Sequence, residues 1–491
     1  MRRLVAIAAV TLTGALVTGC AVGPEYTRPP VTTPDQIRGD EAATAAASLA
    51  DRAWWEIFQD DALKGLIDEA LQNGYDVRLA AWRVEEARAS AGIVRSGFDP
   101  AIQADGGWSR SRQSLGSTLG TAPVNLYDVN LGLTWEIDLW GRIRRLNQAA
   151  LAEYMATEEA RRGVLLSLVS DVATSYFELR QLDLQLDIAR RTAGAFKETY
   201  DLFDRRLQAG AASALETSSA QASLSSTSAS IPDLERQIAA QENRIALLLG
   251  RPPESIPRGT LLNDQLLPAE IPAGLPSDLL ERRPDLRGAE QRLVAANAEV
   301  GVAVADFFPA LSLTGAFGGV SRQVSDLFGD GRTWSVGGGF LSPVFQGRRL
   351  KNEHRAALAR WEEAKVQYER SVTGAFEEVA TALVAYQKLA AAEKEQAGAV
   401  ASFRQAVDLS NSRYVGGLSD YLEVLQAQQQ LFPAENALAR IRFERLATLV
   451  QLYKALGGGW KLSDPAGWRA PELTAASTPA PSGTAAPKST R

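Results

Sequence analysis

The 491-residue sequence offers few side chains that could carry out catalysis or bind a metal. It contains a single histidine, His354, and a single cysteine, Cys20. Zinc sites and most acid–base or nucleophilic centres need several such groups close together. No nucleophile-elbow or phosphate-binding glycine motif stands between a predicted strand and a helix, and no pair of carboxylates is singled out. We therefore expect no enzyme activity, no metal site and no cofactor.

Cys20 has the surroundings of a cysteine that is modified covalently. The stretch MRRLVAIAAVTLTGALVTGC has a basic start, an apolar middle and small residues at its end, which is typical of a signal peptide over residues 1–19. The VTGC spacing matches a bacterial lipobox, in which the thiol receives an S-diacylglycerol group and the new terminus is N-acylated. Several acyl chains anchor a protein durably. The alternative is a cysteine that is discarded with the leader.

The two ends of the mature chain have the composition of extended segments. Residues 20–50 are expected to form a lipidated linker, and residues 461–491 a tail that is disordered from residue 472. The formal charge is −6, which argues against a nucleic-acid partner because phosphate binding needs a clustered basic face. No stretch after the leader has about 18 consecutive apolar residues, so we expect no transmembrane helix.

An internal repeat organises the rest of the sequence. DVRLAAWRVEEARASAGIVRSGFDP at 76–100 aligns with DLRGAEQRLVAANAEVGVAVADFFP at 285–309, and WGR at 140–142 aligns with QGR at 346–348. LLLG ending at Gly250 recurs as KALG ending at Gly457. The sequence therefore predicts two copies of one unit, at 51–250 and 277–460, joined by a proline-rich linker at 251–276.

Each copy is predicted to contain two strands. In YDVNLGLTWEIDL, large apolar residues alternate with Asp, Asn, Gly, Thr and Glu over thirteen positions, which indicates a strand with one apolar and one polar face. The strands are expected at about 101–112, 124–139, 310–318 and 334–345. An ordinary half-buried sheet and a membrane-spanning one both fit. If the strands span a membrane, four cannot close a barrel, so a dimer, a trimer or a larger ring is required.

Each copy is also predicted to contain two very long helices, at 144–209 and 214–249 and again at 349–411 and 421–456. Apolar residues step by threes and fours along them, as in coiled coils, and an unbroken helix over the first range would be about 100 Å long. Pro232 and Pro433 are expected to kink the second helix of each pair. The turns between helices fall at RLQAGAASALE and RYVGGLSDYLE, around Gly210 and Gly417.

The lipobox, the segment CAVGPEYTRPP, the paired repeats and the two glycine-broken turns together resemble the outer-membrane factor family, the TolC-like channels, in its lipoprotein (NodT-type) branch. Ala21 after the cysteine is similar to the outer-membrane sorting signal. The resemblance implies an all-α fold with a membrane β-barrel part, in which a homotrimer forms a 12-stranded barrel and an α-helical periplasmic tunnel. It implies a passive exit duct for drugs or other toxic compounds in the outer membrane, served by a periplasmic adaptor and an inner-membrane pump of the resistance-nodulation-division type.

The resemblance also assigns residues at the two turns. The adaptor-docking tips fall on Arg206, Gly210, Arg413, Gly417, Leu418 and Ser419. The periplasmic gate falls on Tyr414, Asp420, Leu422, Glu423 and Gln426, where several relatives carry Asp in place of Gln426. Coiled-coil packing is the alternative role for Leu422, and the favoured one for its neighbour Leu425.

Two other functions remain open at this point. The same type of channel serves type I protein secretion, and the neighbouring genes would distinguish that role from efflux. A purely structural lipoprotein of long coiled coils, such as an envelope spacer, would leave the paired two-faced strands unexplained.

Overall fold

The computed structural model describes residues 21–34, 37–39, 49–52, 54–112, 123–268 and 276–458. Cys20, the expected signal peptide at 1–19 and the expected tail at 461–491 lie outside the described residues. The chain forms two compact units. Of the described residues, the sheet unit comprises 21–33, 79–112, 123–163 and 283–375, and the tip unit comprises 34, 37–39, 49–52, 54–78, 164–268, 276–282 and 376–458. Each unit therefore draws segments from both sequence repeats.

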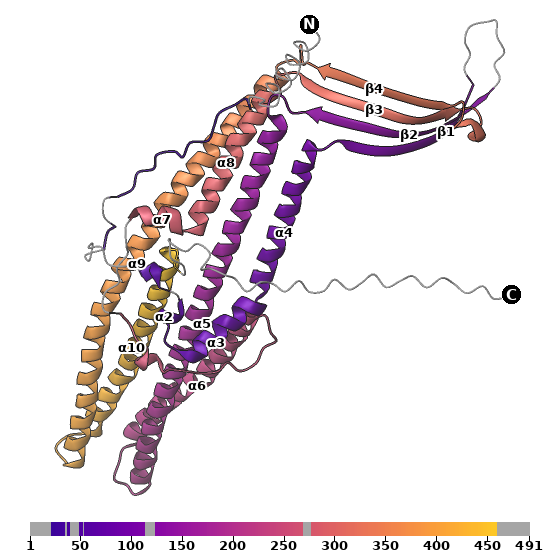
Figure 1. Cartoon of the computed structure of the whole chain (residues 1–491). Helices are drawn as coiled ribbons and strands as arrows, with labels where there is room; N and C mark the ends of the chain where they lie inside the picture. The colour runs from indigo at the N-terminus through magenta and orange to yellow at the C-terminus, as the bar shows by residue number, and fades with distance from the viewer. Residues whose placement is uncertain are drawn as a thin grey trace, which may run out of the picture. The chain divides into compact units, whose positions relative to one another are not determined.

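The described elements follow the same order in both repeats, with shorter helices first, then two strands and then two long helices (Figure 1). In the first repeat they are α2 (Trp54–Ile57), α3 (Asp61–Asn73), α4 (Tyr75–Arg95), β1 (Ala101–Ser111), β2 (Val124–Ile137), α5 (Arg142–Gln208) and α6 (Ala214–Leu249). In the second they are α7 (Pro276–Arg282), α8 (Pro284–Ala305), β3 (Ala310–Ser321), β4 (Arg332–Leu341), α9 (Arg349–Val415) and α10 (Tyr421–Ala455).

The four strands form one antiparallel sheet in the order β1-β2-β3-β4. Strand β3 continues to Ser321, beyond the expected 318, and β4 ends at Leu341 instead of at 345. Pro343 follows β4 after one residue and has no backbone N–H to donate to a neighbouring strand, which explains the early end. The pairing of β2 with β3 joins the two repeats within the sheet.

The long helices begin and continue for identifiable reasons. Asp138 caps the start of α5, because its carboxylate oxygens accept hydrogen bonds from the backbone N–H groups of Ile143 at 3.0 Å and Arg144 at 2.9 Å. Helices α5 and α9 have 67 residues each. Helices α6 and α10 continue through Pro232 and Pro433, so neither proline ends its helix. Among the described residues, no helix combines the length and apolarity needed to cross a membrane.

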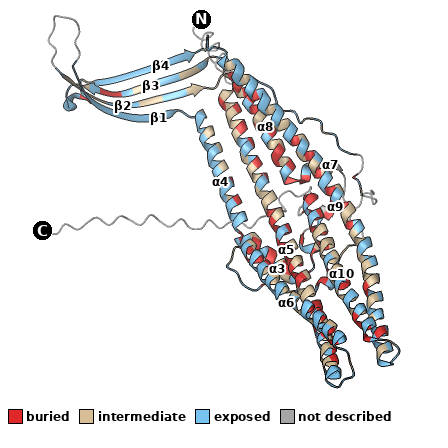
Figure 2. Cartoon of the chain, turned by 180° about the vertical axis from the view of Figure 1, so that it is seen from behind, coloured by how far each residue is buried: buried red, intermediate tan, exposed pale blue. Residues whose placement is uncertain are grey.

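The core of the tip unit surrounds α3 and the middle of α5. Buried side chains of α3, α5, α6, α9 and α10 form one hydrophobic cluster there, coloured as buried in Figure 2. Its largest members include Leu63, Ile67, Tyr176, Phe177 and Tyr453. This cluster fixes the helices from which the two turns extend.

A buried carboxylate, Asp60, ties three segments of the tip unit together. It is 1% exposed, and one oxygen caps the first turn of α3 through two backbone N–H groups at 3.0 and 3.2 Å. The other oxygen accepts hydrogen bonds at 2.9 Å from the Tyr176 hydroxyl, the Thr260 N–H and the Gln265 side chain. Burial raises the pKa of Tyr176, so this hydroxyl stays protonated as a donor. Asp60 therefore fastens the linker between the repeats to α3 and α5.

In the sheet unit, the segment 21–33 runs without regular secondary structure along α5 and α8. The Val22 N–H donates to the Trp140 carbonyl at 3.0 Å, and Arg28 forms hydrogen bonds of 2.7 and 2.5 Å with the Glu290 carboxylate. Gly23 has φ +99° and a Cβ there would lie 2.5 Å from the Gly301 Cα. Only glycine fits this close approach, which explains the glycine in the VGPEYTRP segment.

Candidate functional site

The sheet has one polar and one apolar face, and the strand register aligns each face across all four strands. Ala104, Leu131, Phe317 and Trp334 form a continuous row through successive pairings. The next row, displaced by one residue, consists of Asp105, Asn130, Gly318 and Thr333. Because side chains alternate between faces along a strand, the two rows lie on opposite faces.

The apolar face is exposed in the single chain. Leu131 is 52% exposed, Phe317 57%, Trp334 76% and Phe340 76%. A contiguous apolar surface of this kind marks contact with a membrane or with another protein. Aromatic residues occur near both ends of this face, with Trp108, Tyr127 and Trp334 toward the loops and Trp135 and Phe340 toward the helices. Aromatic girdles at both ends are typical of a sheet that spans a bilayer.

The polar face carries the carboxylates that the alternation predicted. Asn130 donates to Asp105 at 3.4 Å. Toward the helices, Glu136 forms an ion pair with Arg142 at 2.6 Å and Asp138 forms one with Arg144 at 3.1 Å. The part of the chain that the structure describes contains no cluster of His, Cys, Asp and Glu suited to a metal. This face suits contact with water.

Both edges of the sheet are open. Within the described residues, β1 pairs only with β2 and β4 pairs only with β3. The outer backbone groups of the two edge strands therefore have no strand partner, which inside a lipid bilayer would cost several kcal/mol per group.

The two glycine-broken turns lie in the tip unit and have the same backbone hydrogen bonds. At the first turn, Gly210 N–H donates to the Leu207 carbonyl at 2.9 Å and Ala211 N–H to the Arg206 carbonyl at 2.7 Å. At the second turn, the Gly417 N–H donates to the Tyr414 carbonyl at 3.0 Å and the Leu418 N–H donates to the Arg413 carbonyl at 2.9 Å. Gly210 and Gly417 have φ of +71° and +70°. Both turns are Schellman motifs, so the repeat predicts equivalent turns correctly.

The turns differ in how the following helix begins. At α6, Ser213 and Glu216 form a capping box, with bonds of 2.8 and 3.3 Å. At α10, the Asp420 side chain makes no capping hydrogen bond. The first turn therefore has a side-chain cap that the second lacks, and at the second turn the Arg413 guanidinium instead donates to the Leu418 carbonyl at 3.4 Å.

Most residues assigned to adaptor docking are exposed at these turns. Arg206, Gly210, Arg413, Gly417 and Leu418 are exposed. Ser419 is half-buried, and its hydroxyl has no hydrogen-bond partner among the described residues.

The residues assigned to the gate lie beside them and are bonded to them. Arg206 donates to the Tyr414 hydroxyl, and its guanidinium carbon lies 5.5 Å from the centre of that ring. Arg413 lies 3.4 Å from a carboxylate oxygen of Glu423. The structure therefore joins two residues assigned to docking, one from each turn, to two residues assigned to the gate.

The remaining residues assigned to the gate are exposed. Leu422 is 58% exposed, and Asp420 and Gln426 are also exposed. Leu425 is 5% exposed and belongs to the hydrophobic cluster of the tips, in agreement with the packing role favoured for it.

Tyr421 has a packing role that was not predicted from the sequence. Its ring centre lies 4.6 Å from that of Phe203 and 5.2 Å from that of Tyr414. Its hydroxyl is 2.5 Å from the Thr199 hydroxyl. Burial raises the pKa of Tyr421, although the Thr199 hydrogen bond opposes this. Tyr421 joins α10 to α5, and an aromatic residue that opens a helix next to a tight turn was the available signal.

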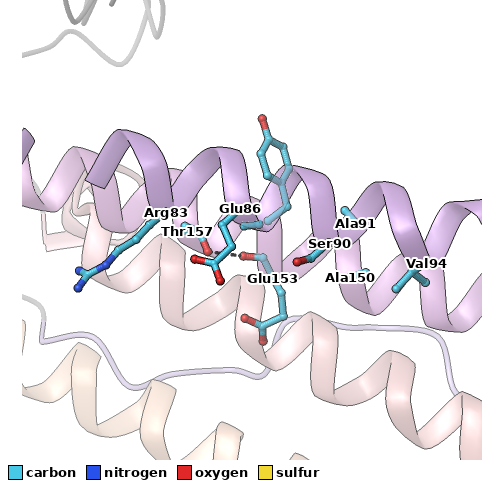
Figure 3. Close-up of a pocket in the computed structure, with 10 residues that line it drawn as sticks. Arg83, Glu86, Ser90, Ala91, Val94, Ala150, Glu153 and Thr157 are labelled. Carbon is cyan, nitrogen blue, oxygen red and sulfur yellow. Dashed lines mark hydrogen bonds between the residues drawn. The ribbon is translucent and has the colours of Figure 1, made fainter. Parts of the chain in front are cut away.

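A groove lies between α4 and α5 in the sheet unit (Figure 3). Arg83, Glu86 and Glu153 line it, and the Thr157 hydroxyl donates to the Glu153 carbonyl at 2.9 Å. Neither histidine nor cysteine lines the groove. It does not resemble an active site.

Comparison with known proteins identifies the chain. The outer membrane efflux protein family matches residues 66–251 and 275–458. The solvent efflux pump outer membrane protein SrpC of Pseudomonas putida is 36% identical over 460 residues, covering 91% of this chain and 96% of SrpC. The cation efflux system protein CusC of Escherichia coli is 34% identical over 447 residues, covering 90% of this chain and 96% of CusC.

Solved structures agree in fold. The outer-membrane channel OprN has a TM-score of 0.83 and 32% identity, over 90% of this chain and all 100% of that chain. The open-state MtrE channel of Neisseria gonorrhoeae has a TM-score of 0.81 and 32% identity, over 90% of this chain and 99% of the MtrE chain.

The two-faced sheet and the long paired helices therefore define a channel protein. The chain belongs to the outer membrane efflux protein family. It is the outer-membrane exit duct of an efflux pump and not an enzyme. The family resemblance drawn from the sequence is confirmed.

Proposed function

We propose that three copies of the chain close their sheets into one 12-stranded barrel, with the long helices forming a tunnel through the periplasm. The observation that carries this proposal is a sheet with an exposed apolar face and two open edges. Pairing β4 of one copy with β1 of the next satisfies both edges and keeps the strands antiparallel. Three copies give twelve strands, which leaves a lumen wide enough for water. Asp105 and Asp128 then line that lumen.

We further propose that acyl groups on Cys20 anchor the chain in the outer membrane. The segment that follows the cysteine supports this, because Val22 is bonded to Trp140 where β2 leads into α5. A lipid on Cys20 would then emerge beside the end of the sheet from which the helices start. No other bound group is needed.

The proposed partners are a periplasmic adaptor at the tips and an inner-membrane pump of the resistance-nodulation-division type, which supplies the energy. The cargo would be drugs or other toxic small molecules. The carboxylates Asp105 and Asp128 on the polar face would make a water-lined wall, which supports passive conduction in which the pump selects the cargo.

Reconstitution of the purified full-length protein tests the assembly. We expect a detergent-solubilised particle with the protein mass of three chains and discrete conductance steps in planar bilayers. A monomer without conductance would contradict the trimeric barrel. Replacing Cys20 by Ser should leave conductance intact but reduce the fraction in outer-membrane preparations from cells.

We propose that the second turn carries the gate and the first turn its fixed support. Three-fold symmetry brings three copies of Leu422 and Glu423 together around the tunnel axis, where the apolar side chains and like charges would constrict it. Arg413 partly neutralises each Glu423 within its own chain. Release of the Arg206–Tyr414 bond would free α9 and α10 to move outward, and adaptor binding at the tips would compete for Arg206.

Replacing Leu422 and Glu423 by Ala together should raise single-channel conductance severalfold, because a bulky constriction and its charges are removed. The matched control is Leu215→Ala with Glu216→Gln, which changes the equivalent residues of the first turn and keeps the side-chain acceptor for Ser213. The control should conduct like the wild type. Unchanged conductance in the first variant would move the gate elsewhere.

A further inference from the structure

Both edge strands of the sheet carry a tryptophan and an arginine two residues apart at the same end. This end, the loop end, is where the connections after β1 and before β4 lie, away from the helices. On β1 the pair is Trp108 and Arg110, and on β4 it is Arg332 and Trp334. Since residues two apart share a face, each arginine lies on the apolar face with its tryptophan.

The strand register confirms that these positions belong to the apolar face. Trp108 pairs with Tyr127, and Trp334 pairs with Phe317. Trp108 is 63% exposed and Trp334 is 76% exposed. The arginines are the next residues outward on that face, so each one directly follows the aromatic girdle.

The two guanidinium groups have no acidic partner within the described residues. Arg332 donates only to the Phe328 carbonyl, at 3.3 Å, and Arg110 forms no ion pair with any described side chain. Both side chains are exposed. An exposed, unpaired guanidinium beside an aromatic residue is available to an anionic group, which it can bind through two parallel hydrogen bonds.

The opposite end of the apolar face lacks this feature. At the helix end, the described strand residues on this face are apolar, as at Trp135, Ile137 and Phe340. The charged residues Glu136 and Asp138 belong to the polar face and are paired with Arg142 and Arg144. Aromatic residues therefore occur at both ends, but strand arginines occur on the apolar face at the loop end alone.

We propose that Arg110 and Arg332 bind phosphate groups of lipid headgroups in the leaflet at the loop end, with Trp108 and Trp334 packed against the adjoining lipid. The bound anion must reach an arginine that lies directly beyond a lipid-facing tryptophan. Tryptophan side chains of this kind lie at the membrane–water interface, where the headgroup phosphates also lie. Both pairs lie on edge strands, which meet at the boundary between copies in a closed barrel. Each boundary then receives one arginine from each of two chains. This inference rests on the proposed membrane-spanning trimer.

The test uses the full-length protein in nanodiscs of phosphatidylcholine with and without dioleoyl phosphatidic acid. After detergent extraction, native mass spectrometry measures how many phosphatidic acid and phosphatidylcholine molecules remain bound. The variant Arg110→Gln with Arg332→Gln should lose the preference for phosphatidic acid by about tenfold. Arg244→Gln with Arg370→Gln is the matched control, because both of these arginines are exposed and have no ion pair within the described residues.

The conductance of the same purified proteins in planar bilayers separates this inference from the proposed function. The lipid site is supported if all three proteins conduct, the wild type and the control retain phosphatidic acid, and the Arg110→Gln with Arg332→Gln variant does not. A conducting wild type without any preference, or a variant with the same preference, overturns the lipid site alone. A wild type that neither inserts nor conducts overturns the proposed barrel and the lipid site together.

Discussion

Replacing Leu131 by Arg is expected to prevent the protein from inserting into the outer membrane. Leu131 lies midway along β2 on the apolar face, in register with Ala104 and Phe317, and is 52% exposed. An arginine facing lipid near the bilayer centre costs about 2–4 kcal/mol, and a closed ring of three copies would incur this cost three times. The variant should be absent from outer-membrane fractions and give no conductance.

The neighbouring substitution Asn130→Arg is the matched control. Asn130 lies on the polar face, bonded to Asp105 at 3.4 Å, so the added charge would face water near carboxylates. This variant should insert normally and change only ion selectivity. If both variants insert equally, the apolar face does not contact lipid and the barrel proposal fails.

Replacing Asp60 by Asn is expected to lower the free energy of unfolding by about 3 kcal/mol. The Asp60 carboxylate accepts five hydrogen bonds in a buried position. An amide of the same shape presents its own N–H groups to some of these donors, which leaves buried polar groups unpaired. Circular dichroism at 222 nm during heating measures the effect through the helices of the tip unit.

Asp61→Asn provides the control one residue away. The Asp61 side chain is 98% exposed and pairs only with Lys64 on the surface, at 3.1 Å. We expect a change of about 0.5 kcal/mol or less. A similar loss for the two variants would mean that the hydrogen bonds of Asp60 do not fasten the linker.

Local patterns in the sequence account for the elements and turns. Alternation from Tyr127 to Ile137 matches β2 because a strand with one wet and one apolar face must alternate, but the strand ends before the predicted 139, since Asp138 caps α5 instead. The repeat predicts the second turn from the first, since both need a glycine with positive φ. The end of β4 before Pro343 could also have been predicted, because proline interrupts a strand ladder.

Contacts between distant residues could not be predicted in the same way. Asp60 meets Tyr176 and Thr260 across 116 and 200 positions, and Arg206 meets Tyr414 across 208. The apolar periodicity of its helix predicts that Tyr176 packs, but nothing in the local sequence of Asp60, Thr260 or Arg206 indicates these contacts. Their partners depend on how the long helices pack, which single-sequence periodicity does not determine.

The β2–β3 pairing joins the hairpins of the two repeats within one chain. Each repeat contributes one hairpin of two strands, and the register from Tyr127–Ser321 to Ile137–Leu311 already joins one hairpin to the next. In the proposed ring, six hairpins alternate around the axis, and three of their six junctions are made inside single chains. Because both hairpins belong to one chain, those three junctions form during folding, at a fixed effective concentration however dilute the protein is. The remaining three junctions, in which β4 of one copy pairs with β1 of the next, still depend on protein concentration. Dilution, or a ligand bound to an edge strand, would therefore block assembly at this step.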